Sequence, residues 1–165
     1  MPRKQPNEVA RMRTSHTEHD LEESLPYLLN RAGVRIADCF SHEIAPLRVS
    51  LGAWRVCASL HKQDHQRLSD LAAHTSIDVS TLSRMVAGLM TQGWVQRERS
   101  SNDARALQLS LTASGHAMVE SIIPLAQWYE RLALAGLDPG QAASLKVMLK
   151  HIFRNFSAIP PRKST

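Results

Sequence analysis

The chain has 165 residues, 43% of them hydrophobic, with a formal net charge of +5 and a sequence pI of about 9.7. This length and composition suit one globular domain with accessory helices, and the basic balance favours a nucleic-acid partner. A membrane protein is excluded, because no apolar run approaches the roughly 20 residues that cross a bilayer, and no secretory signal is found. We therefore expect a cytoplasmic, nucleoid-associated protein.

The beginning of the chain predicts an arm and then a helix. Residues 1–20 are polar and contain several basic residues, so we expect a flexible arm there. The segment 21–45 contains a predicted helix that Ser24 caps and Pro46 ends. Apolar residues cover more than one face of this helix, which is typical of packing against a second subunit. We therefore assign residues 21–45 to dimerisation.

Three helices are predicted next. Ser50 caps the first, over residues 51–62. Two shorter helices follow over residues 67–74 and 79–92, and Asp78 is placed to cap the second of them. Gly93 is expected to end that helix as a left-handed C-cap.

The second short helix has the polarity of a recognition helix. One side is apolar, and the other carries three short hydroxyl residues and an arginine, namely Ser80, Thr81, Ser83 and Arg84. Short side chains let a helix approach a groove closely, and arginine can bind a guanine edge or a phosphate. This pattern predicts a helix-turn-helix that reads the major groove. An ordinary helical hairpin with a solvated polar face is the alternative.

A β-hairpin is predicted directly after this helix. Residues 94–99 and 105–112 alternate between apolar and polar side chains, and residues 100–103 form a turn. The alternation in the second strand places Leu107, Leu109 and Leu111 inward. A hairpin after a recognition helix makes a winged helix, so residues 46–112 are the predicted DNA-binding domain.

The predicted hairpin is basic, since it carries Arg97, Arg99 and Arg105. Asp103 is close enough in sequence to hold the guanidinium of Arg105 by a charge-assisted hydrogen bond. An arginine held in this way suits a narrow minor groove, where the potential is most negative. A solvated surface ion pair is the alternative interpretation.

Two amphipathic helices are predicted after the wing. Thr112 caps the first, over residues 113–135, and Asp138 caps the second, with Pro139 at its first position. Because the winged helix already buries its own core, the apolar stripes of residues 113–157 favour a two-fold dimer built from both ends of the chain. Residues 158–165 are expected to be a tail.

These motifs together resemble the multiple-antibiotic-resistance regulator (MarR) family. The similar stretches are residues 77–86, 93–97, 103–105 and 109–115. The most specific part is the Asp-x-Arg wing followed by alternating leucines and Thr-x-x-Gly. The resemblance implies a mainly α fold with a small β-hairpin wing: a winged helix-turn-helix domain plus N- and C-terminal dimerisation helices.

The resemblance also implies a function. Members are homodimeric transcription regulators, usually repressors, that bind a pseudo-palindromic double-stranded DNA operator, and many release it on binding a small aromatic or phenolic effector. The expected DNA contacts here are Ser80, Thr81, Ser83, Arg84, Arg97, Arg99, Asp103 and Arg105. An effector crevice could be lined by Arg31, Arg35, Trp54, Arg55 and Met118. A core tryptophan with surface arginines is the alternative for that group.

Other functions have weaker support. The sequence lacks a glycine-rich phosphate loop and a Gly-x-Ser-x-Gly elbow, so we expect no enzyme, catalytic residue or cofactor. His61 and His65 straddle a predicted helix end and match no ligand set, so no metal site is expected. Cys39 and Cys57 lie among apolar residues and are interpreted as buried. A redox- or metal-responsive regulator of this fold, or a winged helix used only for protein contact, remains the alternative.

Overall fold

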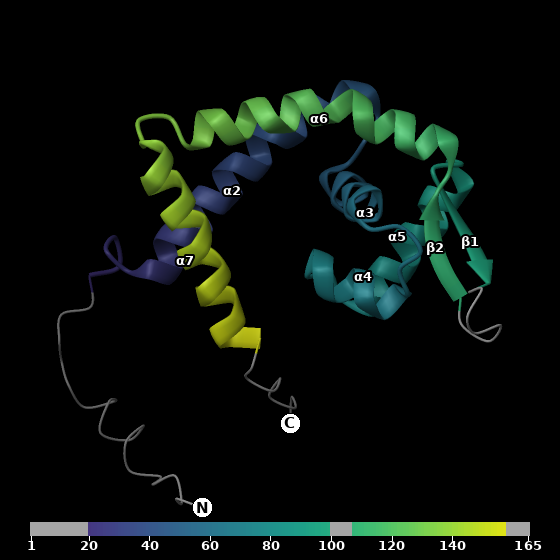
Figure 1. Ribbon diagram of the computed structural model, residues 1–165, viewed down its shortest axis with the longest axis horizontal. Coiled ribbons are helices and arrows are strands. Elements are labelled where there is room, and N and C mark those ends of the chain that lie inside the picture. Colours follow the sequence, from purple (N-terminus) through teal and green to yellow (C-terminus); the bar gives the residue numbers. More distant parts are fainter. Residues whose placement is uncertain (1–19, 100–106, 158–165) are drawn as a thin grey trace, which may run out of the picture. The chain divides into compact units, whose positions relative to one another are not determined.

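The computed structural model describes residues 20–99 and 107–157. The chain divides into two compact units, Met1–Cys39 and Phe40–Thr165. Figure 1 shows the order of the helices and the hairpin along the chain. The predicted arm and tail fall mostly outside the described residues, and so do Asp103 and Arg105 of the wing.

Helix α2 confirms the first predicted helix. It runs over Leu25–Ile44 and is followed by a short 3-10 helix, η1, over Ala45–Leu47. Pro46 lies within η1, where its ring prevents continuation of the α-helix. The last turn of α2 buries Phe40 and Ile44 in the core of the second unit.

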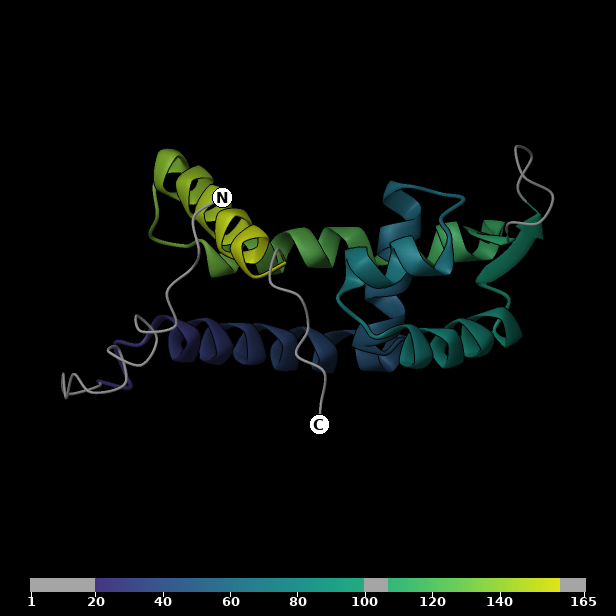
Figure 2. The same ribbon diagram turned by 90° about the horizontal axis from the view of Figure 1, so that it is seen from below.

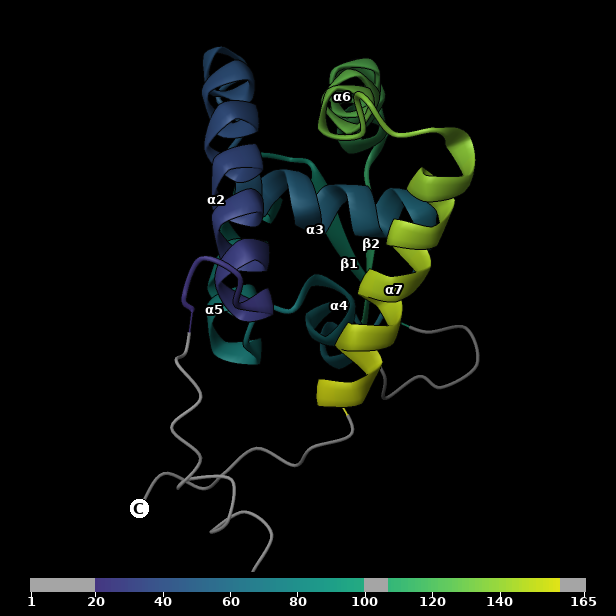
Figure 3. The same cartoon turned by 90° about the vertical axis from the view of Figure 1, so that its left-hand side faces the viewer.

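Two of the three helices of the winged domain begin at the expected caps, Ser50 and Asp78, whereas α4 follows Arg67 without a side-chain cap. Helix α3 covers Leu51–Lys62, and the Ser50 hydroxyl accepts a hydrogen bond from the Ala53 amide at 3.1 Å. Helix α4 covers Leu68–Thr75 and α5 covers Val79–Thr91. Gly93 has φ +74°, which confirms the predicted left-handed end of α5. Figure 3 shows α3 lying between α6 and α4.

The hairpin pairs β1, Val95–Arg99, with β2, Leu107–Leu111, in antiparallel register. Leu109 and Leu111 are buried as predicted. The prediction for Leu107 was wrong, because this side chain is 52% exposed. Leu107 pairs with Arg99 at the described end of the ladder, where the hairpin has run past the core.

The other edge of β2 is covered by a short extended segment. The backbone of Gln66 exchanges two hydrogen bonds with Leu109, at 3.2 and 2.8 Å. The Gln66 side chain is buried, and its Nε2 donates to the carbonyls of Ser59 and Gln63. Its Oε1 lies 2.6 Å from His74 Nδ1, so both polar atoms are satisfied. Ser110 is also buried, contrary to the simple alternation, since β2 lies between β1 and Gln66 and packs on α3.

Helix α6, Ala113–Ala133, starts immediately after β2. The Thr112 hydroxyl accepts from the Gly115 amide at 3.0 Å and donates to the Gly93 carbonyl at 2.5 Å. The Ser114 hydroxyl donates to the same carbonyl at 2.7 Å. A Cβ on Gly115 would lie 2.1 Å from the Trp94 carbonyl oxygen, so only glycine fits there. The Thr-x-x-Gly motif therefore joins the end of α5 to the start of α6.

Helix α7, Pro139–Ser157, is capped by Asp138, whose carboxylate accepts from the amides of Gly140 and Gln141. An ion pair between Lys146 and Glu130 links α7 to α6. None of its residues is buried. Figures 1 and 2 show α7 turning back from the end of α6 that is farther from the hairpin.

The hydrophobic core lies inside the winged domain. It joins the last turn of α2 to α3, α4, α5, the hairpin and the first half of α6, and its largest fully buried side chains are Ile44, Leu60, Leu71, Leu82, Ile122, Val56, Val86 and Val119. Among the described helices, none is long and apolar enough to cross a membrane.

Candidate nucleic-acid interface

Helix α5 separates a buried face from a polar face. Leu82, Val86 and Leu89 are buried. On the opposite side of the helix, Ser80, Ser83 and Arg84 are exposed. Thr81 is half-buried at the border between the two faces. The structure therefore brings the four predicted recognition-helix residues onto one side of α5.

The start of α5 is held by Asp78. Its carboxylate accepts hydrogen bonds from the Ser80 hydroxyl at 2.6 Å and from the Thr81 amide at 2.9 Å. These bonds, led by the one from Ser80, hold the pKa of Asp78 well below its ordinary value. Because the Ser80 proton points to Asp78, the free lone pairs of the Ser80 hydroxyl are acceptors toward solvent.

Arg84 lies one turn further along α5. Its Nη2 donates to the Thr81 hydroxyl at 3.4 Å, and the guanidinium is exposed. No acidic side chain is paired with it among the described ion pairs, so its charge faces solvent.

Three further exposed residues of α5 were missed by the sequence reasoning. Ala87 and Thr91 continue the exposed stripe that begins at Ser80, and Val79 is 52% exposed at the first position. The 3.6-residue periodicity, followed outward from Ser80, was the signal that could have found Ala87 and Thr91. The outer face is therefore lined by small side chains along its length, with Arg84 as its long cation.

The basic residues of the hairpin lie on β1. Arg97 and Arg99 are exposed and pair in register with Leu109 and Leu107. Glu98 points to the opposite face, where its carboxylate accepts a hydrogen bond from the Gln96 side-chain Nε2 at 2.6 Å and lies 3.5 Å from His65 Nδ1. Asp103 and Arg105 lie outside the described residues, so their pairing stays a prediction.

The winged domain is similar to known transcription regulators. The model of the MarR family matches residues 49–107. The chain is 26% identical over 136 residues to the HTH-type transcriptional repressor NicR of Pseudomonas putida, covering 82% of this chain and 85% of NicR. A MarR-family transcriptional regulator from Silicibacter pomeroyi superposes with a TM-score of 0.76 at 26% identity, covering 86% of this chain and 96% of that one. Over residues 49–107 the chain therefore resembles the MarR family. Another structure with the MarR fold is Bordetella bronchiseptica BpsR, solved to explain how 6-hydroxynicotinic acid regulates its DNA binding (TM-score 0.70, 24% identity, 86% of this chain and 99% of that one).

The predicted effector residues fall in both units. In the second unit, Trp54 is half-buried against Phe40, with ring centroids 5.8 Å apart, Met118 packs on the same core, and Arg55 is exposed. In the first unit, Arg31 lies over the Tyr27 ring at 5.4 Å and Arg35 is exposed. Trp54 and Met118 thus have packing roles of their own, as the alternative interpretation expects.

The two cysteines differ in exposure. Cys57 is fully buried, and this burial raises the pKa of its thiol to about 12. Cys39 is only partly buried, so the expectation that both are buried was wrong for Cys39. It lies on α2 as the last residue of the first unit.

Proposed function

We propose that this protein is a homodimeric repressor of the MarR type that binds a pseudo-palindromic operator. The observation that carries the proposal is the outer face of α5, where small polar side chains surround the exposed Arg84 guanidinium. Such a face can enter a major groove, since small side chains allow close contact and arginine supplies a specific donor pair.

The exposed residues of α5 offer different kinds of contact to DNA. Arg84 is a bidentate donor to a guanine edge or to a phosphate, and its bond to Thr81 restricts its reach. Ser80 is an acceptor toward a cytosine or adenine amino group, because its proton is bound by Asp78. The exposed methyls of Val79 suit the 5-methyl group of thymine.

The wing adds affinity rather than base reading. Arg97 and Arg99 present two exposed cations on one strand next to α5, and Arg105 is expected to add a third at the tip. Cations near phosphates release counterions, which makes binding salt-dependent for every sequence. Asp103 is proposed to orient Arg105 toward the minor groove.

The dimer is proposed from the apolar surface of the C-terminal helices. Side chains on α7 and the end of α6 are exposed in a single chain, including Trp128, Leu132, Met148, Phe153 and Phe156. Exposed apolar surface of this extent is typical of an interface. A second copy of the chain covers it and places two α5 helices against two operator half-sites.

An effector is proposed to release the DNA. The support comes from BpsR, whose DNA binding is regulated by 6-hydroxynicotinic acid. Arg31 and Arg35, in the first unit, stay predictions from the sequence. The candidate contacts within the second unit are Trp54, Arg55 and Met118. A small aromatic acid fits their chemistry, because indole and thioether surfaces accept a ring and guanidinium groups bind a carboxylate.

The test is to select operator fragments from a random DNA pool and to measure binding by fluorescence anisotropy. Arg84→Ala should weaken operator binding by about 1–3 kcal/mol, and it should relax the preference at one position if Arg84 reads a base. Arg97→Ala should weaken all sequences alike and lower the salt slope by about one unit per lost phosphate contact. Arg131→Ala, which removes an exposed arginine from the last turn of α6, is the matched control and should bind normally.

The proposal fails if the folded Arg84 and Arg97 variants both bind the selected operator with wild-type affinity. The DNA-reading surface would then lie elsewhere, and a winged helix used for protein contact would become the better account.

A further inference from the structure

Two imidazoles meet where the end of α3 lies against the start of α6. His61 is in the last turn of α3 and His116 is in the first turns of α6. Their Nδ1 atoms are 3.3 Å apart, and the ring centroids are separated by 5.4 Å with an interplanar angle of 61°. Both side chains are half-buried, so the pair is shielded without being closed to solvent.

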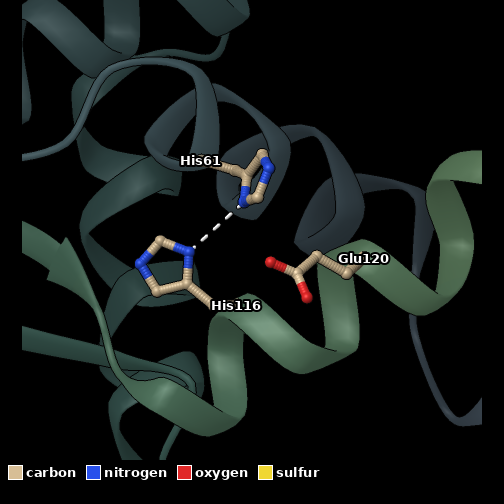
Figure 4. A group of neighbouring side chains, drawn as sticks. All are labelled: His61, His116 and Glu120. Atoms are coloured by element: carbon tan, nitrogen blue, oxygen red, sulfur yellow. Dashed lines mark hydrogen bonds between the residues drawn. The ribbon is translucent and has the colours of Figure 1, made fainter.

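A carboxylate completes the group. Glu120 follows His116 by one helical turn, which places both on the same face of α6. One ligand atom from each of His61, His116 and Glu120 lies within 4.8 Å of the other two. Figure 4 shows the Glu120 carboxylate directed toward the two rings.

The separation of the two nitrogens fits a metal ion better than a direct hydrogen bond. Zinc binds imidazole nitrogen at about 2.0–2.1 Å, so two ligands of a tetrahedral site are about 3.3–3.4 Å apart. The distance between His61 Nδ1 and His116 Nδ1 matches that edge. An N–H donor prefers an acceptor at about 2.9–3.0 Å.

A second carboxylate lies near the other nitrogen of His116, at ion-pair distance and beyond direct hydrogen-bond range. Asp64 Oδ2 is 4.0 Å from His116 Nε2, and Asp64 Oδ1 accepts from the Leu111 amide at 3.2 Å. The Asp64 side chain is therefore anchored to β2. Metal-bound histidines commonly donate their second nitrogen to a carboxylate, which leaves the first nitrogen free to bind the ion.

We propose that His61, His116 and Glu120 form a binding site for Zn²⁺, with Asp64 as the residue that positions His116 and with water in the fourth position. Two imidazoles and one carboxylate favour zinc over magnesium or calcium, which prefer all-oxygen ligands. The ion would fasten the end of α3 to the start of α6 beside the wing strand β2.

This site was not expected from the sequence. His61 and His116 are 55 positions apart, so their meeting depends on the packing of α3 against α6. The sequence reasoning paired His61 with His65, which instead lies 3.5 Å from Glu98.

The experiment is calorimetric titration of the chelator-treated full-length protein with Zn²⁺, together with Co²⁺ titration followed by visible absorption. We expect one ion per chain and the absorption of a tetrahedral Co²⁺ centre. Zn²⁺ at about a hundredfold above its dissociation constant should raise the Tm by about 5–10 °C. Asp64→Asn should weaken binding by about 10–100-fold, as is typical of a residue that orients a ligand.

Variants locate the ion. His61→Gln, His116→Gln and Glu120→Gln should each weaken Zn²⁺ binding at least about tenfold and abolish the Co²⁺ band. His151→Gln, on the exposed surface of α7, is the matched control and should bind like wild type. Glu120 is exposed, so its variant tests the site without disturbing the core. The proposal would be overturned if the wild-type protein did not bind Zn²⁺. It would also be overturned if the folded Glu120→Gln and His116→Gln variants bound Zn²⁺ with the same affinity as the wild type.

Discussion

Replacement of Gly115 by alanine tests the joint between the wing and α6. A Cβ at this position would lie 2.1 Å from the Trp94 carbonyl oxygen, 3.0 Å from its carbonyl carbon and 3.1 Å from a Leu111 methyl. Two of these atoms belong to the backbone, so the first turn of α6 must move away from the hairpin. Forcing a methyl group into a packed site costs about 1–3 kcal/mol.

Gly88 provides the control, because it is also a helical glycine and a Cβ there meets nothing within 4 Å. Alanine at an open helical position stabilises by about 0.5–1 kcal/mol. The free energies of unfolding of Gly115→Ala and Gly88→Ala should therefore differ by about 1.5–4 kcal/mol, with changes of opposite sign. Urea unfolding followed by circular dichroism at a fixed protein concentration measures both. Equal or greater stability of Gly115→Ala relative to wild type would refute this packing argument.

Three further predictions follow from the caps, the buried thiol and the exposed apolar helix. Asp78→Ala should lower the Tm at neutral pH. Because the pKa of Asp78 is depressed in the folded protein, its carboxylate stabilises the fold fully above a pH of about 4, and this stabilisation is lost in acid. The Tm difference between the variant and the wild type should therefore shrink as the pH falls. At pH 8, iodoacetamide should modify Cys57 in the folded protein at least about a hundredfold more slowly than in urea, by mass spectrometry, because its raised pKa leaves little thiolate; rapid modification would contradict its burial. Phe153→Asp should dissociate or unfold the proposed dimer, because it would bury an unpaired charge. Sedimentation would detect this as the loss of a species of twice 18.4 kDa, and Lys150→Gln on the same helix should leave that species in place. A monomeric wild-type protein would remove the basis for the two-fold operator.

The helix boundaries were accessible from the sequence because local chemistry decides them. Ser50, Asp78 and Thr112 accept hydrogen bonds from the amides of their helices' first turns, and Gly93 has the positive φ that the end of α5 requires. Such interactions span only a few residues, so residue type and spacing are sufficient to place them.

The features that were missed depend on distant packing. Leu107 is exposed because the hairpin extends beyond the core, and a period of two does not show where the core ends. Ser110 is buried because Gln66, from another part of the chain, pairs beside β2. Likewise, the meeting of His61 with His116 requires α3 to lie against α6. On α5 the polar face itself was predictable, since it follows from helical periodicity alone.

The carbonyl of Gly93 accepts hydroxyl hydrogen bonds from both Thr112 and Ser114, while the Trp94 carbonyl accepts from the Thr112 amide at 3.0 Å. The end of α5 and the start of α6 are thus joined directly by three hydrogen bonds. A change in the tilt of α6 should therefore move the end of α5 with it. In the proposed dimer, the spacing of the two α5 helices would then depend on the angle of α6, far from the polar side chains that would touch DNA.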